Sequence, residues 1–569
     1  MSEIRLSKLK IVNYRSFKTP QVFDFPTAEY LKPISIIGYN NSGKTTMMNA
    51  ILYGIGEKFL NVKTFEVQDL HNLDLENQIE IKTRIDATPY GQNNYGPQTI
   101  AGEYTIKTEL VDNELKSTCS KSFFGANKHY NIFYINFHNI KDEISIKKSS
   151  WGSLTSFLAK HIRKLVDTDD LINQRKQEYL DAVNQASANV LDGSALSQFV
   201  AKIKENYSNN LRRNDCEVEF GTPEYDDIFL QMIFKVGLNG NTENLVPLSH
   251  LGDGYISMFV MAVIQAIAES NLDDKCLFLF EEPESFLHEN HQEYFYKMVL
   301  CQLAENGHQV IYTTHSDKMI DIFDTKSIIR LEFDEIEKCS VKKYNKVDDF
   351  DPQVGNIISL ENFNSFIKSV EPNINKILFS RKVILVEGPN DLLAYTFAIE
   401  KFVRELSTND KYSKAYLNFK NISIAVHHGK ATAFIMAELC KHFALDFFMI
   451  NDWDMDEEHF TTLSEILTED QLRESDTYLF RDAIPRNPTE KGTLTTNWKL
   501  INKSIINQIH FNLPKLEAVL GYNSDDKNSL GIWNRLNEMQ GFEENFFPQN
   551  LKTFLEFGDI QLPENNNVA

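Results

Sequence analysis

Acidic residues follow two short apolar stretches in the C-terminal half of the chain. The first stretch, KVILV, precedes Glu387 and Asp391, and the second, DFFMI, precedes Asp452 and Asp454. Both stretches predict buried strands of a parallel sheet, whose carboxyl ends gather at one edge. Four carboxylates at one edge repel one another unless hard divalent cations lie between them. The pattern therefore predicts a site for Mg²⁺ or Mn²⁺, and two such ions would stabilise the attacking and leaving oxygens of a phosphodiester.

These acids have a structural alternative, in which solvated side chains cap the edge of a Rossmann-like sheet. That is the usual interpretation of an isolated Asp-x-Asp pair. Here a Glu-Gly-x-x-Asp pattern stands upstream in the correct order, which favours the metal site. Gly388 permits a sharp turn after Glu387, so Asp391 would lie one helical turn further along. We therefore expect all four carboxylates to bind metal and to take part in catalysis.

A second candidate site is the segment GYNNSGKT at residues 38–45. It stands between PISII, which predicts a buried strand, and TMMNAIL, which predicts a helix. Two glycines let the loop wrap, so that backbone N–H groups and the helix N-terminus point at one spot and suit a polyphosphate. Lys44 would neutralise the β- and γ-phosphates and Thr45 would bind Mg²⁺. The residues expected to contact ATP here are Gly38, Asn40, Asn41, Ser42, Gly43, Lys44, Thr45 and Thr46.

Three later motifs are expected to complete the ATP site. Ser249, Gly252 and Gly254 form a Ser/Gly-rich turn before an apolar helix and offer backbone donors to phosphates. The strand CLFLF ends at a Glu-Glu pair, and the strand QVIYTT ends at a histidine.

The pair and the histidine have distinct expected roles. Glu281 would contact the metal shell, Glu282 would polarise the attacking water, and His315 could sense the γ-phosphate. The order of the four motifs resembles the ABC-type ATPase heads of the structural-maintenance and recombination families. The resemblance covers roughly residues 1–345 and implies that ATP closes two heads around two shared sites. Those families usually have Asp at the position of Glu281, so the sequence does not predict how fast this chain hydrolyses ATP.

The acidic block of the C-terminal half looks like a Toprim domain, the metal-binding module of topoisomerases, primases and certain nucleases. An ABC-type head fused to a C-terminal Toprim domain resembles the OLD (overcoming lysogenisation defect) family of ATP-regulated nucleases, which includes the Gabija large subunit and nuclease effectors of some retrons. In that family a further Glu and Lys follow, and Glu517 and Lys527 are the best matches. Lys527 would then stabilise charge on the scissile phosphate. The residues that match the Toprim pattern are Glu387, Gly388, Asp391, Gly429, Asp452 and Asp454.

We predict an α/β chain with two main domains and accessory segments. Apolar residues at helical spacing predict an insertion in the first domain, which would be a dimerisation arm or a simple helical cap. The predicted segments are an ABC-type P-loop ATPase head at 1–355 with the helical insertion at 153–213, a linker helix at 356–376, a Rossmann-like Toprim nuclease domain with a C-terminal extension at 377–560, and a disordered tail at 561–569.

Composition narrows the classes to which the protein can belong. Of 569 residues, 42% are hydrophobic and 24% are charged, so neither general disorder nor a membrane protein is expected. The six cysteines are scattered, which favours reduced thiols over disulfides or a zinc site. No signal peptide is visible, so we expect a cytoplasmic location. The net charge of -22 disfavours nucleic-acid binding over the whole surface, and DNA would need a local patch.

One such patch is predicted at residues 481–499. This segment is rich in Pro, Asn and Thr, and its basic and aromatic residues could follow a DNA backbone. A solvated loop is an equal alternative. The residues concerned are Arg481, Arg486, Lys491, Trp498 and Lys499.

The sequence favours an ATP-binding, metal-dependent DNA endonuclease of the OLD type, assembled as at least a dimer. Nucleotide occupancy at Lys44 is expected to control the distant carboxylates. The resemblance alone implies anti-phage defence, with a defence-system partner protein or a retron reverse transcriptase and its RNA–DNA as partner. Two other classes stay open. One is an ATP-dependent DNA-binding or scaffold protein with a non-catalytic Toprim fold, and the other is a topoisomerase- or primase-like enzyme, for which no tyrosine nucleophile or zinc motif is evident.

Overall fold

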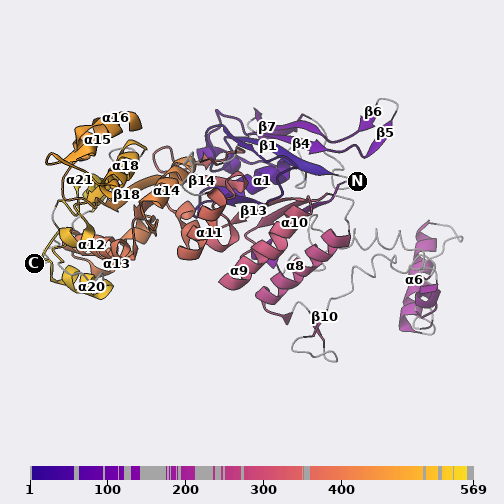
Figure 1. Cartoon of the computed structure of the whole chain (residues 1–569). Coiled ribbons are helices and arrows are strands. Elements are labelled where there is room, and N and C mark those ends of the chain that lie inside the picture. Colours follow the sequence, from indigo (N-terminus) through magenta and orange to yellow (C-terminus); the bar gives the residue numbers. More distant parts are fainter. Residues whose placement is uncertain are drawn as a thin grey trace, which may run out of the picture. The chain divides into compact units, whose positions relative to one another are not determined.

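The computed structural model (Figure 1) describes the chain in stretches separated by gaps. The described residues are 3–56, 63–93, 96–112, 114–120, 130–140, isolated stretches between 175 and 189, 194–211, 235–237, 245–247, 250–270, 275–348, 350–351, 359–503, 508–522, 528–542 and 544–560. The predicted tail at 561–569 and most of the predicted insertion at 153–213 lie outside them, as do Ser249 and Lys527. Among the described residues, no helix combines the length and the apolar character needed to cross a bilayer.

The chain forms two compact units that do not follow its order. The first contains Met1–Arg15, Thr27–Pro33 and Thr45–Thr314. The second contains Ser16–Pro26, Ile34–Lys44 and His315–Ala569. Each unit combines several separate stretches of the chain, so the division does not test the domain boundaries predicted at 355 and 377. These boundaries stay predictions.

The first unit contains an antiparallel sheet. Strand β4 (Glu80–Ala87) pairs with β1 (Ile4–Val12) on one side and with β7 (Gly102–Val111) on the other, and β8 (Glu114–Cys119) pairs with β7. Buried residues alternate with more exposed ones along β4, as expected of a sheet with one covered face.

The first unit also contains three parallel strands, and Glu281 ends the middle one. Strand β12 (Leu277–Glu281) pairs with β9 (Ile132–Asn136) and with β13 (Gln309–Thr314), and all five residues of β12 are buried. A parallel strand covered on both faces needs such a continuous apolar sequence. The helices of this unit include α6 (Ala195–Leu211), α8 (Asp253–Ser270), α9 (Glu289–Phe295) and α10 (Gln302–Glu305).

The second unit contains the strand before the glycine loop, β3 (Ile34–Ile37). It pairs in parallel with β14 (Ile328–Asp334), which places Arg330 opposite Ile37, and β14 pairs antiparallel with β15 (Cys339–Tyr344). The guanidinium of Arg330 is buried and donates hydrogen bonds to the carbonyl oxygens of Leu378 and Ser380 at 3.1 and 2.9 Å.

The same unit contains a four-stranded parallel sheet. Strand β16 (Lys382–Val386) lies between β17 (Ile422–Val426) and β18 (Asp446–Asp452), and β21 (Ile509–Asn512) pairs with the far side of β18. Each of these pairings is parallel, so the carboxyl ends of the strands lie at one edge.

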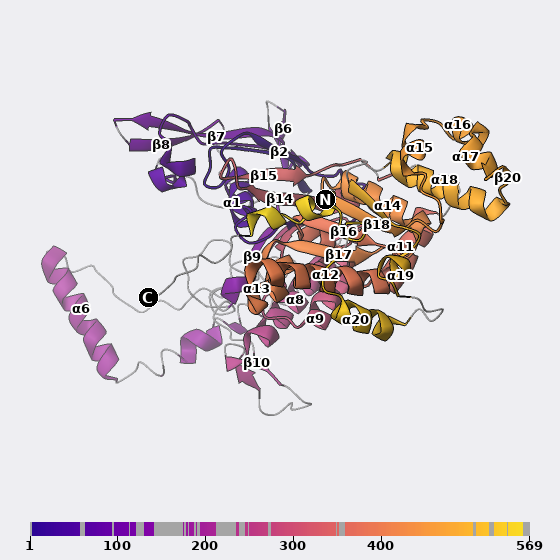
Figure 2. The same ribbon diagram turned by 90° about the vertical axis from the view of Figure 1, so that its left-hand side faces the viewer.

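Helices cover both faces of this parallel sheet. Because side chains alternate along a strand, Val383 packs in a core with α14 (Lys430–His442) and Ile384 packs in a second core with α12 (Pro389–Ser407). Figure 2 shows α14 and α12 on opposite sides of the sheet. The predicted α/β class, with a Rossmann-like domain in the C-terminal half, is confirmed. The other helices here include α11 (Leu360–Val370), within the predicted linker, α13 (Asp410–Phe419), α20 (Ser529–Glu538) and α21 (Gln549–Phe554).

A helical subdomain, residues 460–503, separates β18 from β21. It comprises α15 (Phe460–Glu465), α16 (Glu469–Glu474), α17 (Asp476–Leu479) and α18 (Pro488–Lys503). Its core includes Trp453, Leu494 and Trp498. The interpretation of residues 481–499 as a loop is therefore wrong, because most of this segment is α18, and Trp498 and Arg486 are buried.

Candidate functional site

The carboxyl ends of β16 and β18 bring Glu387 and Asp452 together. Oε2 of Glu387 accepts a hydrogen bond from the backbone N–H of Asp452 at 3.0 Å. The strands pair directly, with Val386 opposite Ile450, so the residues that follow this pair meet at the sheet edge. Two acids that stand far apart in the sequence therefore share one site.

Asp391 lies in the first turn of α12 and is buried. Its Oδ2 accepts a hydrogen bond from the backbone N–H of Gly388 at 3.0 Å, which caps the helix. Its Oδ1 is buried and has no hydrogen-bond partner among the described residues. Burial raises the pKa of Asp391 to about 8, and the charges of Asp452 and Glu387 add to the rise. We refer to Glu387, Asp391 and Asp452 as the acidic cluster.

Asp452 is held by donors from β21 and the turn after it. Oδ1 of Asp452 accepts hydrogen bonds from the backbone N–H of Leu516 at 2.9 Å and from Nδ2 of Asn512 at 3.3 Å. Burial and then the charge of Glu387 raise the pKa of Asp452 to about 6, although these two donors oppose the rise. The carboxylate is thus fixed in place while like charges surround it.

Asp454 lies further out than the acidic cluster. Its backbone is left-handed, with φ of +60°, and its Oδ2 lies 2.6 Å from Nζ of Lys430, which begins α14. The charge of Asp454 still contributes to the raised pKa of Asp452. The structure therefore brings three of the four predicted carboxylates together directly and places the fourth beside them, paired with a lysine.

Glu517 is the second residue of α19 (Leu516–Val519). Its side chain is buried, and its Oε2 has no hydrogen-bond partner among the described residues. Because Leu516 donates to Asp452, the first turn of α19 begins at the acidic cluster. Glu517 therefore follows directly after a residue that contacts the acidic cluster, and its role stays a prediction; Lys527 lies outside the described residues.

Three residues near the acidic cluster were missed from the sequence. Lys430 pairs with Asp454, Asn512 holds Asp452, and the buried hydroxyl of Tyr395 donates to Oδ1 of Asn512 at 2.8 Å. Lys430 could have been found, because it directly follows Gly429, which matches the Toprim pattern. Asn512 and Tyr395 carry no such signal, since their roles depend on long-range pairing.

A divalent cation fits the chemistry of the acidic cluster, but the cluster is not a closed cage. Buried like charges and the unpartnered Oδ1 of Asp391 favour a cation as their counter-charge. Across the described ranges, no three His, Cys, Asp or Glu side chains are arranged to hold an ion by themselves. Mg²⁺ commonly binds one or two protein carboxylates and keeps water or phosphate oxygens as its other ligands. The cluster fits a cation of that kind.

The glycine loop after β3 has the backbone that its sequence predicts. Gly38 and Gly43 have φ of +154° and +100°, and Asn41 is left-handed at +66°. A Cβ at Gly38 would lie 2.4 Å from the carbonyl oxygen of Leu331, so no larger residue fits there. Helix α1 (Lys44–Gly54) begins at the end of the loop and directs its N-terminus towards it.

Lys44 and His315 meet at this loop. Nζ of Lys44 donates to the carbonyl oxygens of Gly38 at 2.8 Å and Tyr39 at 3.2 Å, and it lies 3.4 Å from Nδ1 of His315. A phosphate bound by Lys44 would therefore lie near His315, which is the residue expected to sense the γ-phosphate.

The Glu-Glu pair after β12 contacts β9 and the turn after it. Oε2 of Glu281 accepts hydrogen bonds from the hydroxyl of Tyr134 at 2.8 Å and from Nδ2 of Asn136 at 3.2 Å. Glu282 has φ of +48°, and its Oε2 lies 2.5 Å from Nε2 of His138. Both carboxylates are thus oriented by residues that precede the predicted insertion.

The other predicted ATP contacts lie at helix N-termini or in the glycine loop. Gly252 and Gly254 stand at the start of α8, where the carbonyl oxygen of Gly252 accepts a hydrogen bond from the N–H of Tyr255 at 3.0 Å. Thr45 and Thr46 lie in the first turn of α1. Their roles, and those of Asn40, Asn41 and Ser42, stay predictions.

Family models match three stretches of the chain. A model described as AAA domain matches residues 8–219, and one described as AAA ATPase domain matches residues 137–320. The model of the "Overcoming lysogenization defect protein-like, TOPRIM domain" matches residues 378–454. That last stretch contains the acidic cluster and Asp454, whereas Glu517 lies beyond it.

Curated relatives are similar over most of the chain. The OLD nuclease of Thermus scotoductus is 24% identical over 480 residues, which cover 79% of this chain and 83% of that protein. The chain resembles the OLD family. Endonuclease GajA of Bacillus cereus is 21% identical over 71% of this chain and 69% of its own length.

The OLD resemblance predicted from the motifs is confirmed by these similarities, and they support an enzyme with a nucleotide-binding ATPase region and a TOPRIM region. Among solved structures, an SMC head bound to the C-terminal winged-helix domain of ScpA is 15% identical, with a TM-score of 0.36, and covers 59% of this chain and 96% of that one.

Proposed function

We propose that the chain is an ATP-binding, divalent-metal-dependent DNA endonuclease whose reaction takes place at the acidic cluster. The observation that carries the proposal is the contact between Glu387 and Asp452, because it joins two strand ends into one site whose buried carboxylates have raised pKa values. The names of the relatives, OLD nuclease and endonuclease GajA, support cleavage of nucleic acid.

The acidic cluster would hold one or two Mg²⁺ or Mn²⁺ ions, with Asp454 and Glu517 as further candidate groups. Such ions lower the pKa of a bound water and offset charge on a phosphodiester. The contribution of the chain is orientation. The N–H of Leu516 and the amide of Asn512 fix the carboxylate of Asp452, and the N–H of Gly388 fixes that of Asp391. Lys527, if it acts as in the resembled family, would stabilise charge on the scissile phosphate.

The ATPase region would bind ATP and regulate this cleavage. Lys44 and His315 would contact the phosphates, Thr45 and Glu281 would hold Mg²⁺, and Glu282 would polarise water. The residues that supply the remaining contacts are Gly38, Asn40, Asn41, Ser42, Gly43, Thr46, Ser249, Gly252 and Gly254. We further propose a homo-oligomer that assembles through these heads and acts on DNA in the cytoplasm in anti-phage defence, with a partner of the kinds named for the resembled family.

The experiment that tests the nuclease uses the full chain with plasmid and single-stranded DNA, in Mg²⁺, Mn²⁺ or EDTA. We expect cleavage in either metal, none in EDTA, and a loss of at least about a hundredfold in Asp452→Asn. Asp446→Asn is the matched control, because Asp446 is an exposed acid at the opposite end of the same strand. Cleavage of DNA by Asp452→Asn at the wild-type rate would refute the proposal.

The same assay separates the nuclease from an ATP-dependent DNA-binding protein with a non-catalytic TOPRIM fold. That alternative draws support from the open arrangement of the acidic cluster, since among the described residues no three His, Cys, Asp or Glu side chains are arranged to bind a metal ion by themselves. It predicts DNA binding without cleavage in any metal, for the wild type as for the variants.

A further inference from the structure

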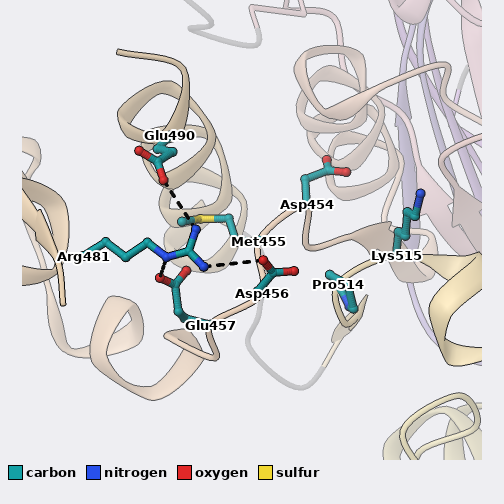
Figure 3. A pocket seen from close by; sticks show the side chains of 8 residues that line it. All are labelled: Asp454, Met455, Asp456, Glu457, Arg481, Glu490, Pro514 and Lys515. Carbon is teal, nitrogen blue, oxygen red and sulfur yellow. Dashed lines mark hydrogen bonds and ion pairs between the residues drawn. The ribbon is translucent and has the colours of Figure 1, made fainter. Parts of the chain in front are cut away.

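A pocket of about 340 Å³ opens beside the acidic cluster. At one end it is lined by Asp454 and Lys515, and at the other by Arg481 and Glu490 of the helical subdomain (Figure 3). The N–H of Asp454 donates to the carbonyl oxygen of Pro514 at 2.7 Å, so the floor of the pocket is tied to the end of β18. Asp454 follows Asp452 by two residues, and Lys515 precedes Leu516, whose N–H donates to Asp452, so the pocket adjoins the acidic cluster on this side.

The lining of the pocket disfavours a phosphate and favours groups that donate hydrogen bonds. Four carboxylates line it against two cations, and Met455 and Pro514 add apolar surface. Carboxylates repel an anion but accept hydrogen bonds from amino groups. The carboxylates are those of Asp454, Asp456, Glu457 and Glu490, and the cations are Arg481 and Lys515.

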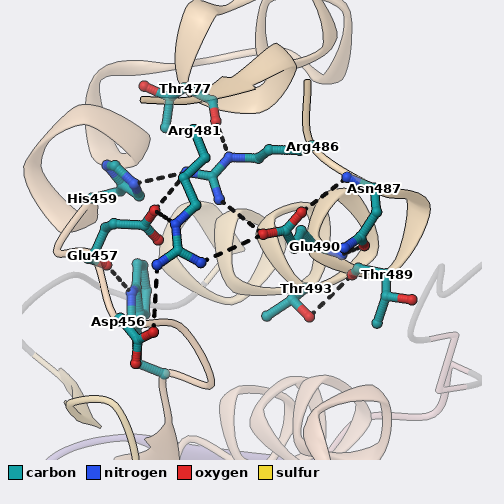
Figure 4. Close-up of polar contacts among 11 residues, drawn as sticks. Asp456, Glu457, His459, Thr477, Arg481, Arg486, Asn487, Thr489, Glu490 and Thr493 are labelled. Atoms are coloured by element: carbon teal, nitrogen blue, oxygen red, sulfur yellow. Dashed lines mark hydrogen bonds and ion pairs between the residues drawn. The ribbon is translucent and has the colours of Figure 1, made fainter. Parts of the chain in front are cut away.

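Two arginines pair with the same two carboxylates, those of Glu457 and Glu490, and they differ in exposure. The side chain of Arg486 is 1% exposed, donates to the carbonyl oxygen of Thr477 at 2.9 Å, and lies 3.6 Å from Glu457 and 3.8 Å from Glu490. Arg481, 44% exposed, lies 2.6 Å from Glu457 and 3.8 Å from Glu490 (Figure 4). The third nitrogen of the Arg481 guanidinium lies 3.5 Å from Asp456, so carboxylates on three sides orient its plane at the pocket wall.

We propose that this pocket accepts an unpaired nucleobase of the DNA strand, next to the scissile phosphate. The guanidinium of Arg481 stacks on the base, and the carboxylates accept hydrogen bonds from an exocyclic amino group. Adenine, cytosine and guanine carry such a group and thymine does not. The pocket therefore gives the enzyme a preference against thymine at one position beside the cut. This inference rests on the proposed nuclease function.

The test maps cleavage of single-stranded oligonucleotides in Mn²⁺ by the full chain. We expect a position next to the cut at which thymine, which lacks the amino group, or an abasic site, which lacks the stacking surface, lowers the rate by roughly tenfold, the size of one lost hydrogen bond to a charged acceptor or one lost stacking contact. Arg481→Ala should reduce the discrimination against the abasic site, and Asp456→Ala, which removes the acceptor that Asn would keep, should reduce the discrimination against thymine, each to about twofold or less. Arg473→Ala is the matched control, because Arg473 also pairs with a glutamate of the helical subdomain, at 2.6 Å from Glu469, but does not line the pocket.

Failure of this inference can be told from failure of the nuclease. A wild-type protein that cleaves no DNA would overturn both. A wild type that cleaves every base context equally, or discrimination that Arg481→Ala and Asp456→Ala leave unchanged, would overturn the proposed base pocket and leave the nuclease in place.

Discussion

The backbone N–H of Asp452 donates a hydrogen bond to Oε2 of Glu387 at 3.0 Å, across a separation of 65 residues in the chain. Glu387→Gln keeps an acceptor for this N–H and removes one negative charge. We therefore expect cleavage to fall by at least about a hundredfold with little change in stability. Glu387→Ala also removes the acceptor, and should lower the free energy of unfolding by about 1 kcal/mol. Parallel cleavage assays and urea titrations check both variants, and a fully active Gln variant would contradict the role of the charge.

Above about pH 7 the stability of the metal-free protein should fall as the pH rises to about 8, whereas at lower pH four histidines whose pKa values burial lowers to about 4 have the opposite effect. An unfolded Asp ionises near pH 4, whereas burial raises the pKa of Asp391 to about 8 and that of Asp452 to about 6 in the fold. Between these values the two aspartates of the folded state hold protons that the unfolded state has released, which makes unfolding easier as the pH rises. Urea midpoints in EDTA at pH 7, 7.5 and 8, where the histidines are largely neutral in both states, measure the slope.

Asp391→Asn should make that slope shallower, because Asn cannot ionise. Mg²⁺ at pH 8 should stabilise the wild type more than this variant, since the variant offers one carboxylate fewer. An unchanged slope in Asp391→Asn would contradict the assignment of the raised pKa to this residue.

Glu556 anchors the C-terminal extension to the TOPRIM sheet. Its carboxylate lies 2.8 Å from Nζ of Lys382, at the start of β16, and 3.0 Å from Nζ of Lys420. Burial alone would raise the pKa of Glu556, but the hydrogen bonds from these two lysines and from Arg381 outweigh it and lower the pKa to about 2. Its contribution to stability is therefore complete above the unfolded pKa, near 4.3, and is lost as the pH falls towards 2.

Glu556→Gln should consequently lower the urea midpoint at pH 7 and have little effect at pH 2.5. Glu544→Gln is the matched control, because Glu544 pairs with a single lysine, Lys552, at 3.0 Å and is largely exposed. An equal effect of the two variants at pH 7 would show that the three cations contribute no more than an ordinary surface pair.

The sequence predicts the order of the acids well, because an apolar run that ends in a carboxylate is typical of a buried parallel strand that leads into a polar site. It does not predict the position of Asp454, whose left-handed backbone and contact with Lys430 appear only when β17 and β18 are placed in one sheet. Nor does it predict α18, where Gly492 and several threonines disfavour a helix. Burial of Leu494 and Trp498 in the core of the helical subdomain outweighs that local preference.

The contact of Lys44 with the loop carbonyls and with His315 predicts how nucleotide binding depends on each residue. Lys44→Ala should weaken ATP binding by about a hundredfold, since it removes a charge-assisted contact to the phosphates. His315→Ala should retain binding within about tenfold and lose any difference between ATP and ADP, because His315 is the group expected at the γ-phosphate. Fluorescent-nucleotide titrations measure the affinities, and cleavage assays with each nucleotide measure the coupling. Cleavage unaffected by ATP, by ADP and by Lys44→Ala would refute nucleotide regulation.

The contact of 2.5 Å between His138 and Glu282 predicts opposite effects of two substitutions on ATP hydrolysis. Glu282→Gln should lower the rate by at least about a hundredfold while ATP still binds, because the carboxylate that we propose to polarise water is lost. His138→Ala should raise the basal rate severalfold, because the carboxylate of Glu282 then loses a hydrogen-bonding partner that competes with water. His288→Ala serves as the control, since His288 caps α9 and lies outside this contact. Slower hydrolysis in His138→Ala would instead mean that His138 positions Glu282. Measurement of phosphate release under saturating ATP distinguishes a faster from a slower rate, and so decides between these roles of His138.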